Sequence, residues 1–207
     1  MKPMEIERRS FEIITQELGE RKLDPEFELV VKRVIHTTAD FDYYDNLCFS
    51  EHAVLRMMDA IRAGCDVITD TTMAQSGINK KLLAQFGGQA RCFIGDEDVA
   101  REAKERGVTR SLASMEKAAR LNKPLIFAIG NAPTALICIR ELMDAGKLKP
   151  ALIVGVPVGF VNVVESKELI MESDRAPYIV ARGRKGGSNV AAAIVNAVLY
   201  QLIQREE

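Results

Sequence analysis

Histidine is scarce in this 207-residue sequence and occurs only at His36 and His52. The four cysteines, none of which forms a C-x-x-C pair, are Cys48, Cys65, Cys92 and Cys138. A zinc site built from three or four His and Cys ligands is hard to assemble from so small and dispersed a set, so we expect no metal. Because each cysteine stands beside apolar residues, we interpret all four as buried thiols of a protein from a reducing compartment.

The sequence also lacks an excess of charge of either sign, since 28 Lys and Arg residues face 29 Asp and Glu residues. This balance argues against a nucleic-acid-binding surface and against a polybasic membrane anchor. The most apolar stretch, residues 190–203, is interrupted by Asn196 and Gln201 and is too short to span a bilayer. Residues 1–14 are charged, unlike a signal peptide. We expect a cytoplasmic protein that binds neither nucleic acid nor membrane.

Hydrophobic residues make up 47% of the chain, enough for a sizeable core, and the length fits one domain over residues 1–207. The first 60 residues read as helical, with one helix ending near His36 and another beginning at Ser50 as its N-cap. From there, helical patterns alternate with short apolar runs at residues 66–69, 91–94, 124–129, 151–156 and 178–181. This alternation predicts about five parallel strands in a three-layer α/β/α sandwich.

Four polar or glycine-rich segments directly follow predicted strands, at residues 69–73, 130–134, 155–160 and 182–188. The carboxyl ends of parallel strands meet at one edge of a sheet, where ligands bind, so we expect these loops to form a pocket. None of them has the spacing of a nucleotide-binding motif. Loop 182–188 combines glycines with three basic residues, which suits either an anion site or a solvated basic turn.

His36 closes an apolar helix and opens the polar segment 37–41. An ordinary pKa near 6.5 suits histidine to proton transfer at neutral pH. Position alone favours a structural helix cap over a catalyst. His52 reads as an exposed polar residue in the first turn of a helix. A hydrolase is disfavoured because the sequence has no G-x-S-x-G motif.

Seven strings along the chain form a recognisable set: R-S-F-E-I-I at 9–14, V-I-H at 34–36, G-V-T-R-S at 107–111, G-N-A-P-T-A-L at 130–136, G-V-P-V-G-F-V at 155–161, E-S-K at 165–167 and R-G-R-K-G-G-S at 182–188. Taken together, they resemble precorrin-8X methylmutases of cobalamin biosynthesis. They occur in the same order as in that family and cover nearly the whole chain.

The resemblance implies a flavodoxin-like fold and a homodimer with active sites near the subunit interface. It also implies a methyl shift between neighbouring ring carbons of a corrinoid, giving hydrogenobyrinate, or cobyrinate when the ring holds cobalt. His36 would donate a proton to a ring nitrogen, and no cofactor is needed because the migration transfers no electrons. Residues 35–43 and 69–78 look closer to the branch that acts on cobalt-containing substrates.

The implied substrate carries several carboxylates, which basic side chains and N–H donors would bind. The substrate-binding candidates are Arg9, Ser10, Arg110, Asn131, Arg182, Arg184 and Lys185. The main alternative is a non-catalytic flavodoxin-like module that holds a tetrapyrrole or a flavin.

Overall fold

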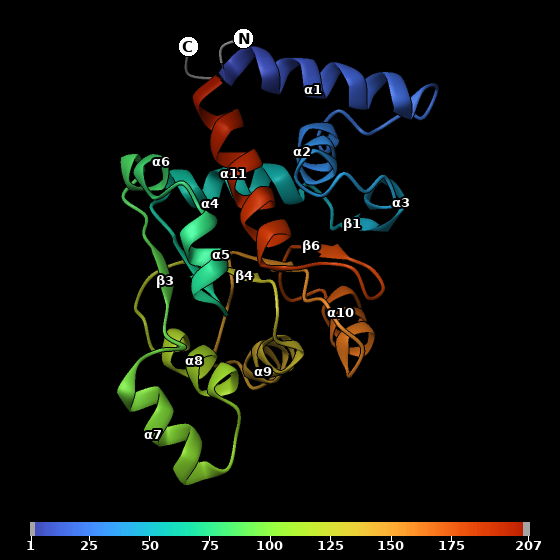
Figure 1. Ribbon diagram of the computed structural model, residues 1–207. Coiled ribbons are helices and arrows are strands. Elements are labelled where there is room, and N and C mark those ends of the chain that lie inside the picture. Colours follow the sequence, from blue (N-terminus) through green and yellow to red (C-terminus); the bar gives the residue numbers. More distant parts are fainter. Residues whose placement is uncertain (1–2, 205–207) are drawn as a thin grey trace.

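The computed structural model describes residues 3–204, with the side chains of residues 5–203 (Figure 1). The helices are α1 (Pro3–Leu18), α2 (Glu28–Thr38), α3 (Tyr43–Asn46), α4 (Ala53–Arg62), α5 (Thr72–Gly77), α6 (Lys80–Gln85), α7 (Glu97–Arg106), α8 (Arg110–Ala119), α9 (Pro133–Asp144), α10 (Val163–Met171) and α11 (Ser188–Gln204). The strands are β1 (Leu47–Phe49), β2 (Asp66–Thr69), β3 (Ala90–Cys92), β4 (Leu125–Ile129), β5 (Leu152–Gly155) and β6 (Tyr178–Ala181).

The strands form one sheet in the order β1-β6-β5-β4-β2-β3. Strands β2 to β6 pair in parallel, and each coincides with one of the five predicted apolar runs to within two residues at either end. The predicted parallel sheet is therefore confirmed. The sheet has six strands and not about five, because β1 adds an antiparallel partner to β6 at one edge.

Strand β1 corrects the prediction that the first 60 residues are helical. Its register is extended by Ser50, whose N–H donates to the Tyr178 carbonyl and whose hydroxyl oxygen accepts from the Tyr178 N–H at 2.9 Å. Ser50 is therefore a strand-pairing residue and not the N-cap of α4. That helix begins at Ala53, after His52 in the left-handed conformation with φ 54°.

Side chains of β4 alternate between two cores on opposite faces of the sheet. Ile126 and Ala128 pack with residues of α2, α4 and α11, whereas Phe127 and Ile129 pack with residues of α8, α9 and α10. Figure 1 shows the sheet between these two groups of helices. Strands buried on both faces need apolar residues at every position, which explains why the sequence shows continuous runs.

The apolar stretch near the C-terminus is the core helix α11, which contacts α2, α4, α5 and β4. A helix that is apolar on nearly all sides is one buried on nearly all sides. Within residues 3–204, no helix combines the length and the apolar character needed to cross a membrane.

The four cysteines are free thiols, but only two of them are buried as predicted. Burial raises the pKa of the Cys65 and Cys138 thiols to about 12. Cys48 and Cys92 are half-buried. At neutral pH the two buried thiols stay protonated and unreactive.

Candidate active site

A buried carboxylate joins two of the loops at the carboxyl edge of the sheet. Asp70, which follows β2 and is 2% exposed, accepts N–H groups from Gly130, Asn131 and Ala132 at 2.9, 2.8 and 2.6 Å. Burial raises the pKa of Asp70, although the three N–H groups act in the opposite direction. Both of its oxygens accept N–H groups from the loop after β4, so Asp70 holds that loop against β2 and shapes the site.

The remaining loops are joined by close backbone approach. A Cβ atom at Gly130 would lie 2.7 Å from the Ser188 Cα, and the Ser188 hydroxyl lies 2.7 Å from the Thr71 hydroxyl. A Cβ atom at Gly186 would lie 2.1 Å from the Val156 carbonyl oxygen. Only glycine fits at either point. The predicted convergence of all four loops is therefore confirmed.

Two of the predicted basic residues already have carboxylate partners. The Lys185 ammonium lies 2.6 Å from both Asp40 and Asp42, and the Arg182 Nε lies 3.2 Å from Glu168. The hydrogen bond from Lys185 is the main cause that lowers the pKa of Asp40. These pairs tie loop 182–188 to the segment after α2 and to α10.

Two other predicted basic residues remain available. Arg184 has no ion pair within residues 3–204, and its guanidinium carbon lies 5.3 Å from the centre of the exposed Phe160 ring. Arg110 opens α8, and its side chain likewise forms no ion pair in the described part of the chain. The Thr109 hydroxyl before it donates to the Thr134 hydroxyl at 3.2 Å, which places Arg110 beside the loop after β4. The carboxyl edge thus presents two cations without counter-charges.

His36 lies in the last turn of α2 and is exposed. The helix ends after it, where Ala39 takes the left-handed conformation and donates its N–H to the Ile35 carbonyl at 2.7 Å. The imidazole stacks on Phe11 of α1, with ring centres 5.6 Å apart and an interplanar angle of 18°. Across residues 3–204, neither ring nitrogen of His36 has a hydrogen-bond partner. The side chain therefore caps no carbonyl and can exchange a proton with a ligand.

The chain connects His36 directly to the basic loop. Asp40 follows it by four residues and binds Lys185. The aspartate therefore fixes the end of α2 against loop 182–188. Through this link, the last turn of α2, which carries His36, is tied to the loop that contains Arg184.

Arg9 and Ser10 are placed differently from the other predicted residues. Both lie on α1, where Arg9 pairs with Glu12 at 3.0 Å and the Ser10 hydroxyl donates to the Ile6 carbonyl at 3.0 Å. No contact in the described residues joins them to the loops at the carboxyl edge. Asn131 does lie in those loops, with its side chain exposed.

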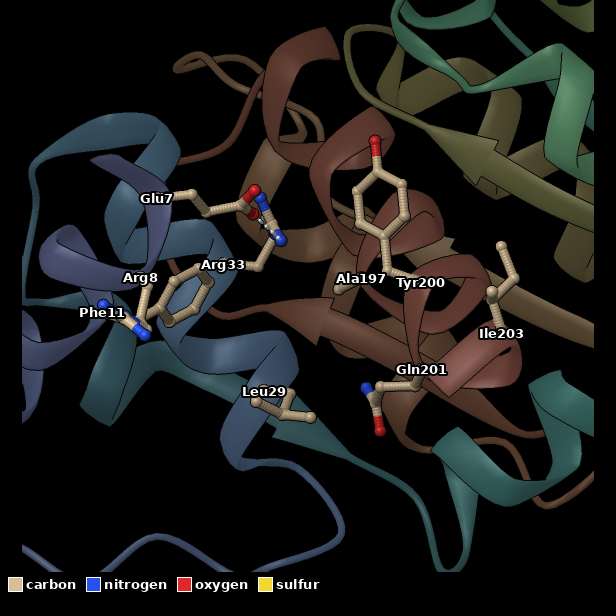
Figure 2. Close-up of a pocket in the computed structure, with 9 residues that line it drawn as sticks. All are labelled: Glu7, Arg8, Phe11, Leu29, Arg33, Ala197, Tyr200, Gln201 and Ile203. Carbon is tan, nitrogen blue, oxygen red and sulfur yellow. Dashed lines mark ion pairs between the residues drawn. The ribbon is translucent and has the colours of Figure 1, made fainter. Parts of the chain in front are cut away.

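A pocket of about 460 Å³ opens between α1, α2 and α11 (Figure 2). Its lining residues are Glu7, Arg8, Phe11, Leu29, Arg33, Ala197, Tyr200, Gln201 and Ile203. None of them is among the site residues predicted from the sequence. Arg33 pairs with Glu7 and lies 5.0 and 5.1 Å from the ring centres of Phe11 and Tyr200. Phe11 therefore lines this pocket and also stacks on His36.

Lys167 of α10, which is not among the predicted site residues, is 0% exposed. Its ammonium donates to the carbonyls of Gly183 and Lys185 at 2.7 and 2.8 Å. Burial lowers the pKa of Lys167 to about 8. The only signal in the sequence is its place in the E-S-K string, which says nothing of its partners.

The second histidine, His52, is exposed as predicted, and its Nδ1 lies 3.3 Å from a Glu26 carboxylate oxygen. Among residues 3–204, no three His, Cys, Asp or Glu side chains are grouped closely enough to hold a metal ion.

Comparison with known proteins identifies a single family. Residues 5–201 match the family model described as precorrin-8X methylmutase. A cobalt-precorrin-8 methylmutase of Salmonella typhimurium is 51% identical over 206 residues, covering 97% of this chain and 96% of that protein. A precorrin-8X methylmutase of Pseudomonas aeruginosa is 39% identical over 194 residues, covering 93% of each. The structure is similar to a precorrin-8x methyl mutase from Thermus thermophilus, with a TM-score of 0.87, 36% identity and coverage of 97% and 98%.

Proposed function

The chain belongs to the precorrin-8X methylmutase family and is an isomerase, and we propose that His36 is the proton donor of its reaction. The family isomerises precorrin-8X to hydrogenobyrinate. Membership therefore decides against the alternative of a non-catalytic tetrapyrrole- or flavin-binding module. The observation that carries the role of His36 is its exposed imidazole, which has no hydrogen-bond partner among the described residues and ends the helix that Asp40 ties to Lys185 of loop 182–188.

The reaction requires the protein to bind the substrate and to supply one acid. The methyl group moves between neighbouring ring carbons, so substrate and product contain the same atoms and no electrons leave the ring. Protonation of a ring nitrogen by His36 withdraws electron density from the conjugated system and favours the migrated product. Because the net reaction is an isomerisation, the proton is returned to His36 or to solvent at the end of the cycle.

Substrate carboxylates bind to Arg110 and Arg184. These side chains lack carboxylate partners in the described chain, whereas Arg182 and Lys185 are already paired. Arginine binds carboxylates through paired N–H donors, and each charge-assisted hydrogen bond is stronger than a neutral one. Arg182 and Lys185 then act mainly to hold the loop, and the exposed Asn131 amide adds a neutral donor at the same edge.

The active enzyme is a homodimer with its sites near the subunit interface. In support, α1 exposes Ile6 to 52% and Ile13 to 40%, an apolar surface suited to a partner protomer. Arg9 and Ser10 lie on the same helix. Because Phe11 of this helix stacks on His36, α1 lies next to the proposed proton donor.

The five parallel strands follow the order second-first-third-fourth-fifth, which supports a flavodoxin-like three-layer sandwich built as one domain over residues 1–207. A cytoplasmic location fits the free thiols.

The natural substrate is cobalt-precorrin-8. Support comes from the 51% identity to the Salmonella typhimurium cobalt-precorrin-8 methylmutase, against 39% to the Pseudomonas aeruginosa precorrin-8X methylmutase.

The proposed function is tested by incubating the purified protein with metal-free and cobalt-loaded precorrin-8 in parallel. The ultraviolet–visible spectrum changes when the methyl group migrates, so each reaction is followed directly. We expect turnover of both, with the higher kcat/KM for the cobalt-loaded ring. A higher kcat/KM for the metal-free ring would reject the cobalt assignment, and no spectral change with either would reject the proposed function.

A further inference from the structure

Lys167 carries a buried positive charge without a carboxylate partner. The side chain is fully enclosed, and no ion pair to it occurs within residues 3–204. Burial of an ammonium group is costly unless its N–H groups are satisfied. The depressed pKa of Lys167, about 8, reflects that cost. Both of its recorded hydrogen bonds go to one loop, the one that carries Arg184.

The two carbonyls that Lys167 holds stand immediately before and after Arg184. They belong to Gly183 and Lys185, at 2.7 and 2.8 Å from the ammonium. The carbonyl of Arg184 itself points elsewhere and accepts the Gly159 N–H at 3.2 Å. Three consecutive carbonyls are thus fixed, two of them by a single side chain. The backbone that sets the direction of the Arg184 side chain has little freedom to rotate.

We infer that Lys167 is a positioning residue for substrate binding: it holds loop 182–188 so that Arg184 meets a substrate carboxylate. The inference rests on the proposed function, in which Arg184 is a carboxylate ligand. A residue that merely fills the core would be replaceable by an apolar side chain, since buried charges give little net stability. A lysine that positions Arg184 would not be replaceable in this way. Methionine would leave the carbonyls of Gly183 and Lys185 without a donor, and the loop could then change its backbone conformation.

A double-mutant cycle on Lys167 and Arg184 distinguishes positioning of Arg184 from a general effect of Lys167 on the stability of the fold. The variants are K167M, R184A and K167M/R184A, and the measured quantity is the affinity for hydrogenobyrinate, followed by absorbance in a titration. Ser166→Ala serves as the matched control, because Ser166 is buried on the same helix and its hydroxyl donates only to the Val163 carbonyl. Thermal unfolding of each variant shows whether it is folded during the titration.

We expect K167M to weaken binding about tenfold in the wild-type background and less than about twofold in the R184A background. S166A should bind like the wild type, and K167R, which keeps charge and donors, should recover part of the loss. If K167M does not fold, K167Q replaces it in the same cycle.

Equal losses from K167M in both backgrounds would overturn the inference, since Lys167 would then act independently of Arg184. Unchanged binding by K167M would also overturn it, while leaving Arg184 as a carboxylate ligand intact. If R184A itself binds normally, the carboxylate role of Arg184 in the proposed function is wrong, and the inference falls with it.

Discussion

The ring of Phe11 stacks on the imidazole of His36, with ring centres 5.6 Å apart. The two residues come from different helices, and the stack is the only recorded contact that orients His36 in the described chain. An imidazole held only by stacking keeps both nitrogens free but loses its orientation if the neighbouring ring is removed.

Replacing Phe11 by alanine should therefore lower kcat several-fold, because the proton donor samples more orientations. The affinity for hydrogenobyrinate should change less than kcat does. Steady-state kinetics with the spectral assay measure the effect. Leu18→Ala, at a buried position of the same helix, is the control for loss of an apolar side chain from α1. An equal loss of kcat in both variants would show that Phe11 has no specific role.

Replacing Arg110 or Arg184 by alanine should raise KM by roughly tenfold to a hundredfold, because each loses a charge-assisted hydrogen bond to a substrate carboxylate. Arg101→Ala is the matched control, since Arg101 is an exposed arginine of α7 and lacks a recorded ion pair. KM, measured with the spectral assay, should rise in R110A and in R184A and stay constant in R101A. An unchanged KM for R110A would remove Arg110 from the site.

Sedimentation should show a dimer at micromolar protein concentration. Ile6→Asp should shift it toward monomer and reduce turnover, because a carboxylate would be buried in the proposed interface. Leu169→Asp, at an exposed position of α10, should leave the dimer intact. A wild-type monomer with full activity would contradict the shared-site arrangement.

Lys167 should make the stability of the fold depend on pH in the alkaline range. Its pKa is about 8 in the folded protein against an ordinary value of 10.5, so the unfolded chain binds more protons between these pH values. Stability contributed by this group therefore rises with pH from about 8 to 10.5. Urea unfolding of wild type and K167M across this range should show their difference in unfolding free energy growing in favour of the wild type. Parallel curves would mean that the pKa of Lys167 is not depressed.

The sheet could be predicted from the sequence because its five parallel strands are buried on both faces and appear as continuous apolar runs. The edge strand β1 could not, since three residues show no period and their partners in β6 lie at least 130 residues further along the chain. Ser50 could not be placed in this strand for the same reason. Its hydroxyl binds the Tyr178 N–H, a tertiary contact that looks in sequence like a helix N-cap.

The candidate site likewise has some features that the sequence predicts and others that it does not. Convergence of the loops follows from the parallel topology, so their residues could be named in advance. Which cations are already paired could not, because Lys185 finds Asp40 and Asp42 more than 140 residues away. The contact between Phe11 and His36 likewise depends on how two helices pack.

The proton-donor role of His36 is tested most directly by the His36→Ala variant, assayed for both turnover and binding, with His52→Ala as the control. We expect H36A to lose turnover by a factor of about 10² or more. Its affinity for hydrogenobyrinate should stay within about twofold of the wild type, and H52A should turn over normally. Near-normal turnover by H36A would show that His36 is not the proton donor.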